Sequence, residues 1–244
     1  MLANIYLHYV LDLWLHDWRR RHARREVCVV RYVDDFVVCL EDERDAQALR
    51  EALAERMRKF GLELHEDKTR VLRFGRYARE RCRERGLRAE TFDFLGFTHA
   101  VGVDGRNGWF QLVRCTARKK REAKMRELRR ELRRRRHQQP RVTHAWLCSV
   151  LRGFDRYYGV PTNERVLRHM HRHVGDAWLR QLQRRSQRAR WNVEQKKRFE
   201  KRFPLPKPEI RHTWPEKRFL ARRTRGGSPV REICTPGSVR GAAR

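Results

Sequence analysis

Two strongly apolar runs flank a pair of adjacent aspartates near the start of the chain. Residues 27–32 and 36–40 are rich in β-branched and aromatic side chains, and Val33, Asp34 and Asp35 lie between them. Such runs, separated by a short polar connection, are typical of two antiparallel strands. The pattern therefore predicts a β-hairpin with two carboxylates at its tip.

Helical periodicity surrounds this hairpin. Residues 2–16 carry apolar side chains at helical spacing and predict a core helix, and residues 41–60 carry a second apolar stripe followed by Gly61, which suits a helix end. Residues 61–74 alternate as strand, turn and strand, and residues 92–99 form another short strand. The apolar positions are Leu2, Ile5, Tyr6, Tyr9, Val10 and Leu13 in the first helix, and Ala46, Leu49, Leu53, Met57 and Phe60 in the second. Up to about residue 115 the pattern is α+β, with helices against an antiparallel sheet.

The amino-acid composition of the chain changes after residue 115. Residues 118–136 hold twelve Lys and Arg against three Glu, and predicted helices follow at about 142–156 and 163–187. Beyond about residue 203 the chain is basic and rich in Pro and Gly, so we expect an extended or partly disordered tail. The predicted domains are 1–115, 116–202 and 203–244.

The charge balance points to a polyanionic partner. The 244 residues include 60 Lys and Arg but only 30 Asp and Glu, which gives a net charge of +30. Nucleic acid is the default partner of so basic a chain, and an anionic membrane surface is the weaker alternative. No apolar window is long enough to span a membrane. The six cysteines form no CxxC pair, which favours reduced thiols in a cytosol-like compartment.

Adjacent carboxylates in a hairpin connection have two interpretations. Asp is common in turns, and an exposed pair requires no function. The apolar flanks, however, would hold this tip rigidly, and the basic surroundings would attract phosphates. Carboxylates meet phosphates through divalent cations, and Mg²⁺ commonly binds one or two carboxylates plus substrate phosphates. The residues alone therefore support a metal-dependent phosphoryl-transfer site.

A wider set of motifs makes this interpretation more specific. RYVDDFVV (31–38) contains a YxDD sequence, and it is accompanied in order by LANIYLHYVLD (2–12), LELHEDKT (62–69) and FDFLGF (92–97). Further on come LRGFDRYYGVPTN (151–163), QRRSQRARW (183–191), PLPKPEIRH (204–212) and GSVRGA (237–242). These blocks resemble the group II intron-encoded reverse transcriptases and maturases, from the YxDD palm motif onward, over nearly the whole chain. The resemblance implies a partial reverse-transcriptase palm followed by an α-helical thumb and maturase domain.

The resemblance assigns roles to individual residues. Asp34 and Asp35 would be catalytic carboxylates that bind Mg²⁺, and Tyr32 and Val33 would lie near the primer end and the incoming dNTP. Lys68 would lie near the departing pyrophosphate, although a lysine at a strand end is also an ordinary surface residue.

A second group of residues would form the primer grip. Phe94, Leu95 and Gly96 would make its turn, although the same aromatic strand could simply pack in the core.

The family's site also requires a third aspartate on an earlier palm strand. That strand and the template-binding fingers would precede LANIYLHYVLD, which here begins the chain. We therefore expect the 244 residues alone not to polymerise, and an upstream fragment would be needed to complete the site. The tail contains Cys234 alone, so no nuclease module with paired cysteines is predicted.

The basic helix predicts contact with RNA, either group II intron RNA or a template–primer duplex. A charge run is often only a solvated face, but here most cations lack a helical partner of opposite charge. Aromatic side chains interleaved with these cations are more often core residues than base-stacking platforms. The candidate contact residues are Lys119, Lys120, Arg121, Arg129, Arg130, Arg133, Arg152, Arg156, Tyr157 and Tyr158.

Three hypotheses remain open at this stage. The chain is the C-terminal portion of an RNA-directed DNA polymerase with maturase function, an RNA-binding maturase-like protein that makes no DNA, or a decayed fragment without activity. In each case we expect a bacterial cytoplasmic location.

Overall fold

The computed structural model describes residues 2–65, 68–105, 108–186, 191–214 and 237–242. The chain divides into two compact units. The sheet unit comprises Met1–Leu95, His99–Val113 and Val230–Arg244, and the helical unit comprises Gly96–Thr98 and Arg114–Pro229. No helix in the described part of the chain is long and apolar enough to cross a membrane.

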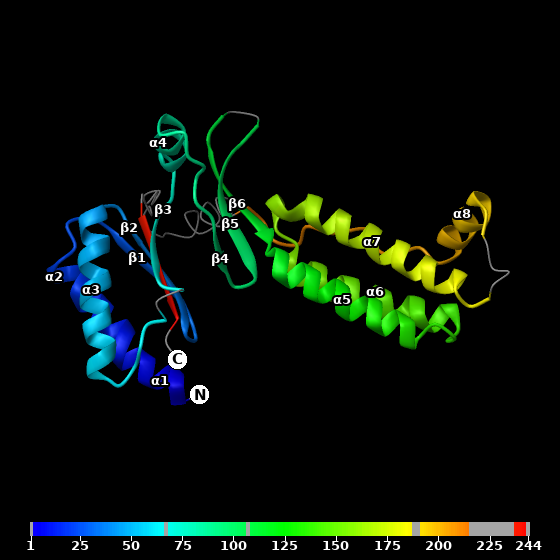
Figure 1. Cartoon of the computed structure of the whole chain (residues 1–244), viewed down its shortest axis with the longest axis horizontal. Coiled ribbons are helices and arrows are strands. Elements are labelled where there is room, and N and C mark those ends of the chain that lie inside the picture. Colours follow the sequence, from blue (N-terminus) through cyan, green and yellow to red (C-terminus); the bar gives the residue numbers. More distant parts are fainter. Residues whose placement is uncertain (1, 66–67, 106–107, 187–190, 215–236, 243–244) are drawn as a thin grey trace, which may run out of the picture. The chain divides into compact units, whose positions relative to one another are not determined.

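The sheet unit combines helices with antiparallel strands, as the pattern predicts (Figure 1). Its helical elements are α1 (Leu2–Leu7), a π-helical turn η1 (His8–Asp12), α2 (Leu13–Arg21), α3 (Glu43–Lys59) and α4 (Ala78–Glu84). Its strands are β1 (Val27–Tyr32), β2 (Asp35–Leu40), β3 (Arg70–Arg73), β4 (Phe92–Phe94), β5 (Phe97–Val103), β6 (Phe110–Thr116) and β7 (Gly237–Ala242). They form one sheet in the order β1-β2-β7-β3 and another in the order β4-β5-β6. The last residues of β6 and the first of β5 fall in the helical unit.

Strand β2 is buried from both sides, which explains its unbroken apolar sequence. Phe36, Val38 and Leu40 are at most 1% exposed and pack with residues of α2 and α3. Val37, on the opposite face, is 5% exposed and packs with Phe92 and Phe94 of β4. Because the side chains of a strand alternate between its two faces, β2 contributes to two hydrophobic cores, one on each face.

Helix α3 forms where its apolar stripe and the following Gly61 predict it. The Asp42 side chain accepts a hydrogen bond from the Arg44 backbone N–H at the start of the helix. The predicted stripe is fully buried except for its last member, since Phe60 is 38% exposed. Gly61 follows with a φ of 68°, as expected beyond a helix end.

The first helix buries a different face from the predicted one. Of the six predicted core positions only Val10 is buried, whereas Leu7, Leu11 and Leu15 face the core. The π turn adds one residue to a helical turn and shifts the register of the buried face. The exposed positions are Leu2, Ile5, Tyr6, Tyr9 and Leu13, at 44–83% exposure.

One expectation about strands is wrong, and one strand was not expected. Residues 61–74 contain β3, but Leu64 forms only an isolated bridge and not a strand. The tail, expected to be extended or partly disordered, contributes the extended strand β7 to the centre of the four-stranded sheet. Val38 of β2 pairs with Val239, which in turn pairs with Val71 of β3. The pairing joins residues some 200 positions apart, which local periodicity does not report.

The helical unit contains α5 (Arg118–Arg134), α6 (Pro140–Tyr158), a short 3-10 turn η2 (Pro161–Asn163), α7 (Glu164–Gln183) and α8 (Val193–Arg202). Its core is one cluster that includes Leu128 of α5, Leu147 of α6 and Val174 of α7, none more than 1% exposed. Trp178 is 3% exposed and belongs to the same cluster, which favours the core interpretation for this aromatic residue.

A buried polar chain ties α6, α7 and the following segment together. Asp155 of α6 is 2% exposed, and its Oδ1 lies 2.8 Å from Nε2 of His171. The other ring nitrogen, Nδ1, lies 2.8 Å from the carbonyl oxygen of Pro206 and donates to it. Because both partners are withdrawn from water, removing either one would leave an unsatisfied polar group.

We predict that Asp155→Ala destabilises the helical unit by about 2 kcal/mol, the usual cost of leaving a buried hydrogen-bonding group without its partner. Hydrogen exchange of α6 and α7 peptides measures the local free energy of opening. Asp176→Ala, at an exposed position on α7, is the matched control and should leave the protection unchanged. Equal protection in both variants would contradict the assigned role of Asp155.

Candidate catalytic hairpin

The two aspartates lie at the tip of the β1–β2 hairpin. Tyr32 pairs with Asp35 at the end of the ladder, so Val33 and Asp34 form a two-residue loop. Asp34 is exposed in the loop, whereas Asp35 is half-buried at the first position of β2. Tyr32 is 62% exposed and precedes the loop. The predicted tip therefore forms, with both carboxylates at one end of the four-stranded sheet.

The loop has a strained backbone. Val33 has a φ of 59°, a left-handed conformation that is unfavourable for a β-branched residue. A positive φ at the first of two loop residues is the geometry of a type II′ turn, where glycine is usual. The strain requires that the surrounding structure hold the loop in place.

Arg31 supplies that constraint. Its guanidinium donates to both carboxylate oxygens of Asp12, from Nε and from Nη2, each at 2.7 Å. A further N–H donates to the carbonyl oxygen of Val33 at 2.7 Å, and another contact joins it to Asn4 Oδ1 at 3.2 Å. One side chain thus connects the π turn, the first helix and the strained loop.

This contact also lowers the pKa of Asp12. Partial burial alone would raise that pKa, but the hydrogen bonds from Arg31 and His8 and their charges outweigh it, so the net pKa lies below its usual value of 3.8. Asp12 and Arg31 were not among the residues predicted from the sequence. Each of these two charged residues lies within an apolar segment of the sequence. Charged residues are rarely buried unless paired, so this placement could have indicated that the two form a pair.

Lys68 lies near the same end of the sheet. It occupies an exposed turn two residues before β3, and the pairing of β3 with β7 and of β7 with β2 brings the start of β3 toward the start of β2. Strand β7 lies between β2 and β3, so Lys68 and Asp35 are about two interstrand spacings, or ~10 Å, apart along the sheet. Lys68 therefore lies near the tip, but its segment is not hydrogen-bonded to the hairpin, because β7 lies between them.

Phe94, Leu95 and Gly96 form the tight turn between β4 and β5. Leu95 and Gly96 have φ values of 48° and 77°, the pattern of a type I′ hairpin turn. Phe94 is 8% exposed and packs in the same cluster as Val37, so the core interpretation applies to its side chain. At Gly96 an added Cβ would lie 3.0 Å from the hydroxyl of Tyr158, so a side chain would be both strained and crowded.

The tip offers two carboxylates to a metal. Among the residues that the structure describes, no group of three or more His, Cys, Asp or Glu side chains is placed to hold a metal ion. Two adjacent carboxylates still match the donor set that Mg²⁺ takes when substrate phosphates complete its coordination. The hairpin thus fits a metal that is bound jointly with a phosphorylated substrate.

A comparison with protein families agrees with this geometry. Residues 1–99 match the family described as reverse transcriptase (RNA-dependent DNA polymerase). This part of the chain is similar to a reverse transcriptase domain. The match covers the first helices, the β1–β2 hairpin, β3 and β4, which are the elements around the reverse-transcriptase-like tip. No curated protein sequence matches the chain.

The predicted nucleic-acid contacts lie in the helical unit. Lys119, Lys120, Arg129, Arg130 and Arg133 are exposed on α5, and Arg121 is half-buried. On α6, Arg152, Arg156 and Tyr157 are exposed, whereas Tyr158 is half-buried against Phe97 and Phe154. Tyr157 also stacks on Phe97, with ring centroids 5.8 Å apart. Tyr158 is therefore mainly a packing residue. Tyr157 has an exposed ring that stacks on Phe97.

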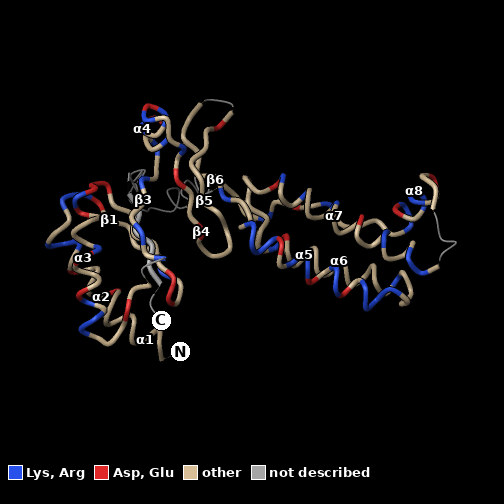
Figure 2. The backbone as a smooth tube through the Cα atoms, viewed as in Figure 1, with Lys and Arg blue, Asp and Glu red and all other residues tan. Residues whose placement is uncertain are grey.

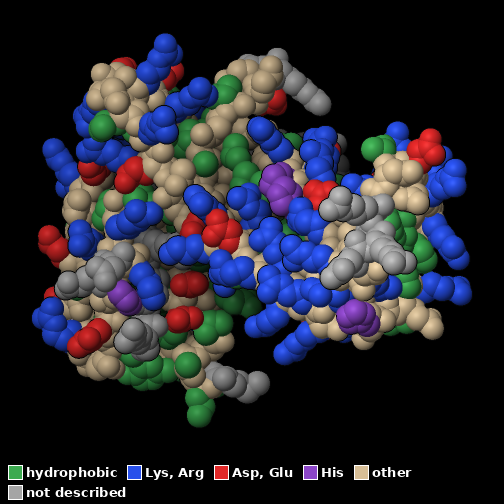
Figure 3. Space-filling view, turned by 45° about the vertical axis from the view of Figure 1, so that its right-hand side comes forward, with side chains coloured by type: hydrophobic (Ala, Val, Ile, Leu, Met, Phe, Trp, Pro, Cys, Tyr) green, Lys and Arg blue, Asp and Glu red, His purple; other side chains and the backbone are tan. Residues whose placement is uncertain are grey.

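The cations of α5 are poorly neutralised. Its three glutamates pair with Arg118, Lys124, Arg134 and Arg135. Within the described chain, the six predicted contact residues of α5 form no ion pair. Figures 2 and 3 show Lys and Arg along α5 and a dense basic field on one face of the helical unit. Like charges at this density repel one another unless an anion lies against them.

We predict that Arg31→Ala lowers the free energy of unfolding of the sheet unit by about 2–3 kcal/mol, because it leaves Asp12 and the Val33 carbonyl without their partner. The measurement is urea denaturation followed by circular dichroism. Arg73→Ala is the control, since Arg73 forms an exposed pair with Glu43 and such pairs contribute little.

The contact between Arg31 and Asp12 also makes the stability of the sheet unit depend on pH. The pKa of Asp12 is lower in the folded chain than the usual 3.8, so its contribution to stability is fully present well above pH 3.8 and is lost as the pH falls through the lowered value. The difference in stability between Arg31→Ala and the unaltered protein should therefore shrink below about pH 4. A difference that stays constant down to pH 2 would contradict this assignment.

Proposed function

We propose that the chain is the palm-hairpin, thumb and maturase portion of a group II intron RNA-directed DNA polymerase, and that it binds RNA. The observation that carries the proposal is the rigidly held pair Asp34 and Asp35, found in a region similar to reverse transcriptases. The basic helical unit that follows supports the RNA-binding part. Its partners would be group II intron RNA, a template–primer duplex and dNTP.

Asp34 and Asp35 would hold Mg²⁺, with the substrate phosphates as the remaining ligands. Bound there, the metal would activate the primer 3′-hydroxyl and stabilise charge on the departing pyrophosphate. The protein's own contribution is positional. Arg31 fixes the loop that carries Asp34, and the two cores on either side of β2 fix the start of the strand at Asp35.

The proposal includes a polypeptide partner that docks on the sheet unit. An exposed apolar face on the first helices, formed by Leu2, Ile5, Tyr6, Tyr9 and Leu13, supports such a partner. Val30, Tyr32 and Val33 of the hairpin are also 41–62% exposed. Apolar surface of this extent is typical of a site where another polypeptide docks.

Primer extension tests the polymerase part. We predict that the purified 244 residues, with Mg²⁺ and dNTP, give no template-dependent DNA synthesis, because within the described residues the tip joins two carboxylates and not the three that the resemblance implies. Addition of a polypeptide carrying the fingers and the aspartate-bearing strand should restore synthesis, and Asp34→Ala should abolish it again. Clear synthesis by the 244 residues alone would contradict the two-carboxylate argument.

A second candidate function is RNA binding without DNA synthesis, which the unpaired cations of α5 favour. Filter binding of group II intron RNA across a salt series tests it, with an unrelated RNA of equal length as competitor. Specific binding would exceed binding to the unrelated RNA by on the order of 10³-fold, by analogy with specific DNA binders. Equal affinity for the two RNAs would reduce the function to bulk electrostatics.

The contribution of α5 can be measured separately. We predict that replacing Lys119, Lys120, Arg130 and Arg133 by Gln flattens the slope of log affinity against log salt by up to about 3, because each lost phosphate contact removes roughly 0.7–0.9. The matched control replaces four exposed arginines at and beside α4, Arg79, Arg81, Arg83 and Arg85, which gives the same change in net charge. Equal effects of the two variants would show that the cations of α5 contribute no more to binding than other exposed cations do.

A further inference from the structure

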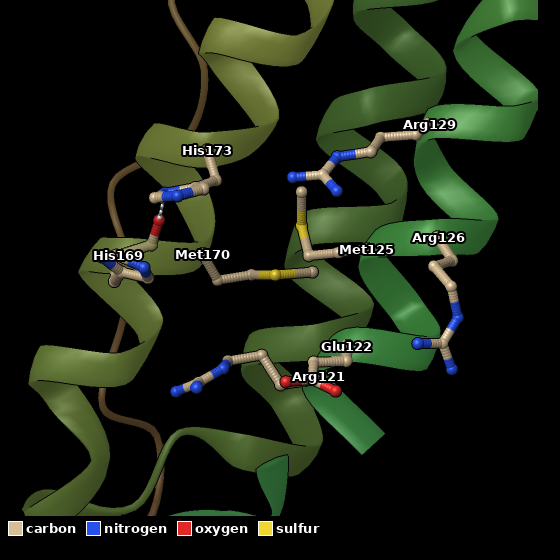
Figure 4. A pocket seen from close by; sticks show the side chains of 8 residues that line it. All are labelled: Arg121, Glu122, Met125, Arg126, Arg129, His169, Met170 and His173. Atoms are coloured by element: carbon tan, nitrogen blue, oxygen red, sulfur yellow. Dashed lines mark hydrogen bonds between the residues drawn. The ribbon is translucent and has the colours of Figure 1, made fainter. Parts of the chain in front are cut away.

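A hollow of about 400 Å³ opens between α5 and α7 in the helical unit (Figure 4). Its apolar floor is made by Met125 and Met170, which are 8% and 1% exposed. Arg121 and Arg129 extend from α5 toward α7, and His169 and His173 lie one turn apart on the facing helix. The hollow thus has an apolar floor and a rim of nitrogen-bearing side chains.

The rim carries excess positive charge. Glu122, the acid that lines the hollow, is already paired with Arg118, with 2.7 Å between Nε and Oε1. Within the described chain, Arg121, Arg126 and Arg129 form no ion pair. Figure 4 shows the guanidinium of Arg126 directed away from the centre of the hollow. Fixed charges beside an apolar floor act more strongly on an anion than they would in bulk water.

The histidine pair can change its charge. The Nδ1 of His173 lies 3.1 Å from the backbone carbonyl of His169, and because a carbonyl only accepts, Nδ1 carries the proton. Because Nδ1 of His173 is used within α7, Nε2 is the ring nitrogen that can contact a ligand in the hollow. The two rings are close, with centroids 4.0 Å apart.

Without an anion, the surroundings disfavour protonation of His169. The neighbouring His173 lowers the pKa of His169 most, followed by a small desolvation effect and by the charges of Arg121, Arg172 and Arg165. The charged groups that face the pair are thus cations of α5 and α7, together with the neutralised Glu122. A bound anion reverses this balance, because it attracts the protonated ring.

We propose that the hollow between α5 and α7 binds a backbone phosphate of RNA, and that this binding takes up a proton on the His169–His173 pair. The inference rests on the proposed RNA-binding function of the helical unit. A phosphodiester suits the site because its two anionic oxygens accept from Arg121 and Arg129 and from a protonated imidazole. An extended polyanion suits it better than a single small anion, since the exposed cations of α5 continue along the same helix.

Binding of a fluorescein-labelled 20-base-pair RNA duplex to the full chain tests the proposal, by anisotropy at constant ionic strength from pH 8.0 to 5.5. For the unaltered protein we expect the affinity to rise about 5- to 10-fold as the pH falls, as proton uptake by one site requires. The His169→Gln/His173→Gln variant should bind at pH 8.0 like the unaltered protein but change less than about twofold. His137→Gln, at an exposed position outside the hollow, is the matched control and should retain the full pH dependence.

A charge-fixing variant provides a second arm. His169→Arg/His173→Arg should bind the duplex at pH 8.0 about as tightly as the unaltered protein does at pH 5.5, without further change on acidification. An unaltered pH dependence in the Gln variant would overturn the proposal while leaving RNA binding intact. Absence of duplex binding at every pH would overturn the proposed RNA-binding function itself, and with it this site.

Discussion

The position of the candidate catalytic loop depends on one guanidinium. Arg31 lies in a strand that is otherwise apolar, and its side chain is only 15% exposed, so its charge has to be matched within the protein. Asp12 matches the charge through two hydrogen bonds, and the carbonyl of Val33 takes a third. Because these partners come from the π turn and from the loop, the same contact that neutralises Arg31 also fixes the tip to the first helix.

That contact explains how a strained loop persists. A left-handed valine costs of the order of 1–3 kcal/mol, and the loop would relax if its ends were free. On one side the Val33 carbonyl is held by Arg31, and on the other Asp35 begins a strand that is packed between two hydrophobic cores. The carboxylates consequently lie on a backbone that has little freedom to move. Such preorganisation is what a metal site with few protein ligands requires.

Local patterns predicted well what depends on neighbouring residues. The strands β1 and β2 followed from two apolar runs, α3 and α7 followed from stripes of period 3.6, and α5 coincides with the predicted basic helix. The buried face of the first helix was predicted wrongly, because a π turn changes the phase of the stripe without leaving a mark on composition. The pairing of β7 with β2 and the contact of Arg31 with Asp12 were not predicted at all. Both join residues distant in sequence, and both depend on how the chain returns to the sheet.

The cations of the helical unit are matched by opposite charges less completely than the cation of the hairpin. At the tip, a buried cation has its full set of partners, whereas on α5 six predicted contact residues have no ion pair within the described chain. Unmatched like charges oppose the packing of α5 against α7, and the shared core of Leu128, Val174 and their neighbours has to offset that repulsion. A polyanion laid against α5 would remove the repulsion and stabilise the same packing. Binding of any polyanion on α5 would therefore be coupled to folding of this unit, since whatever neutralises the charges favours both.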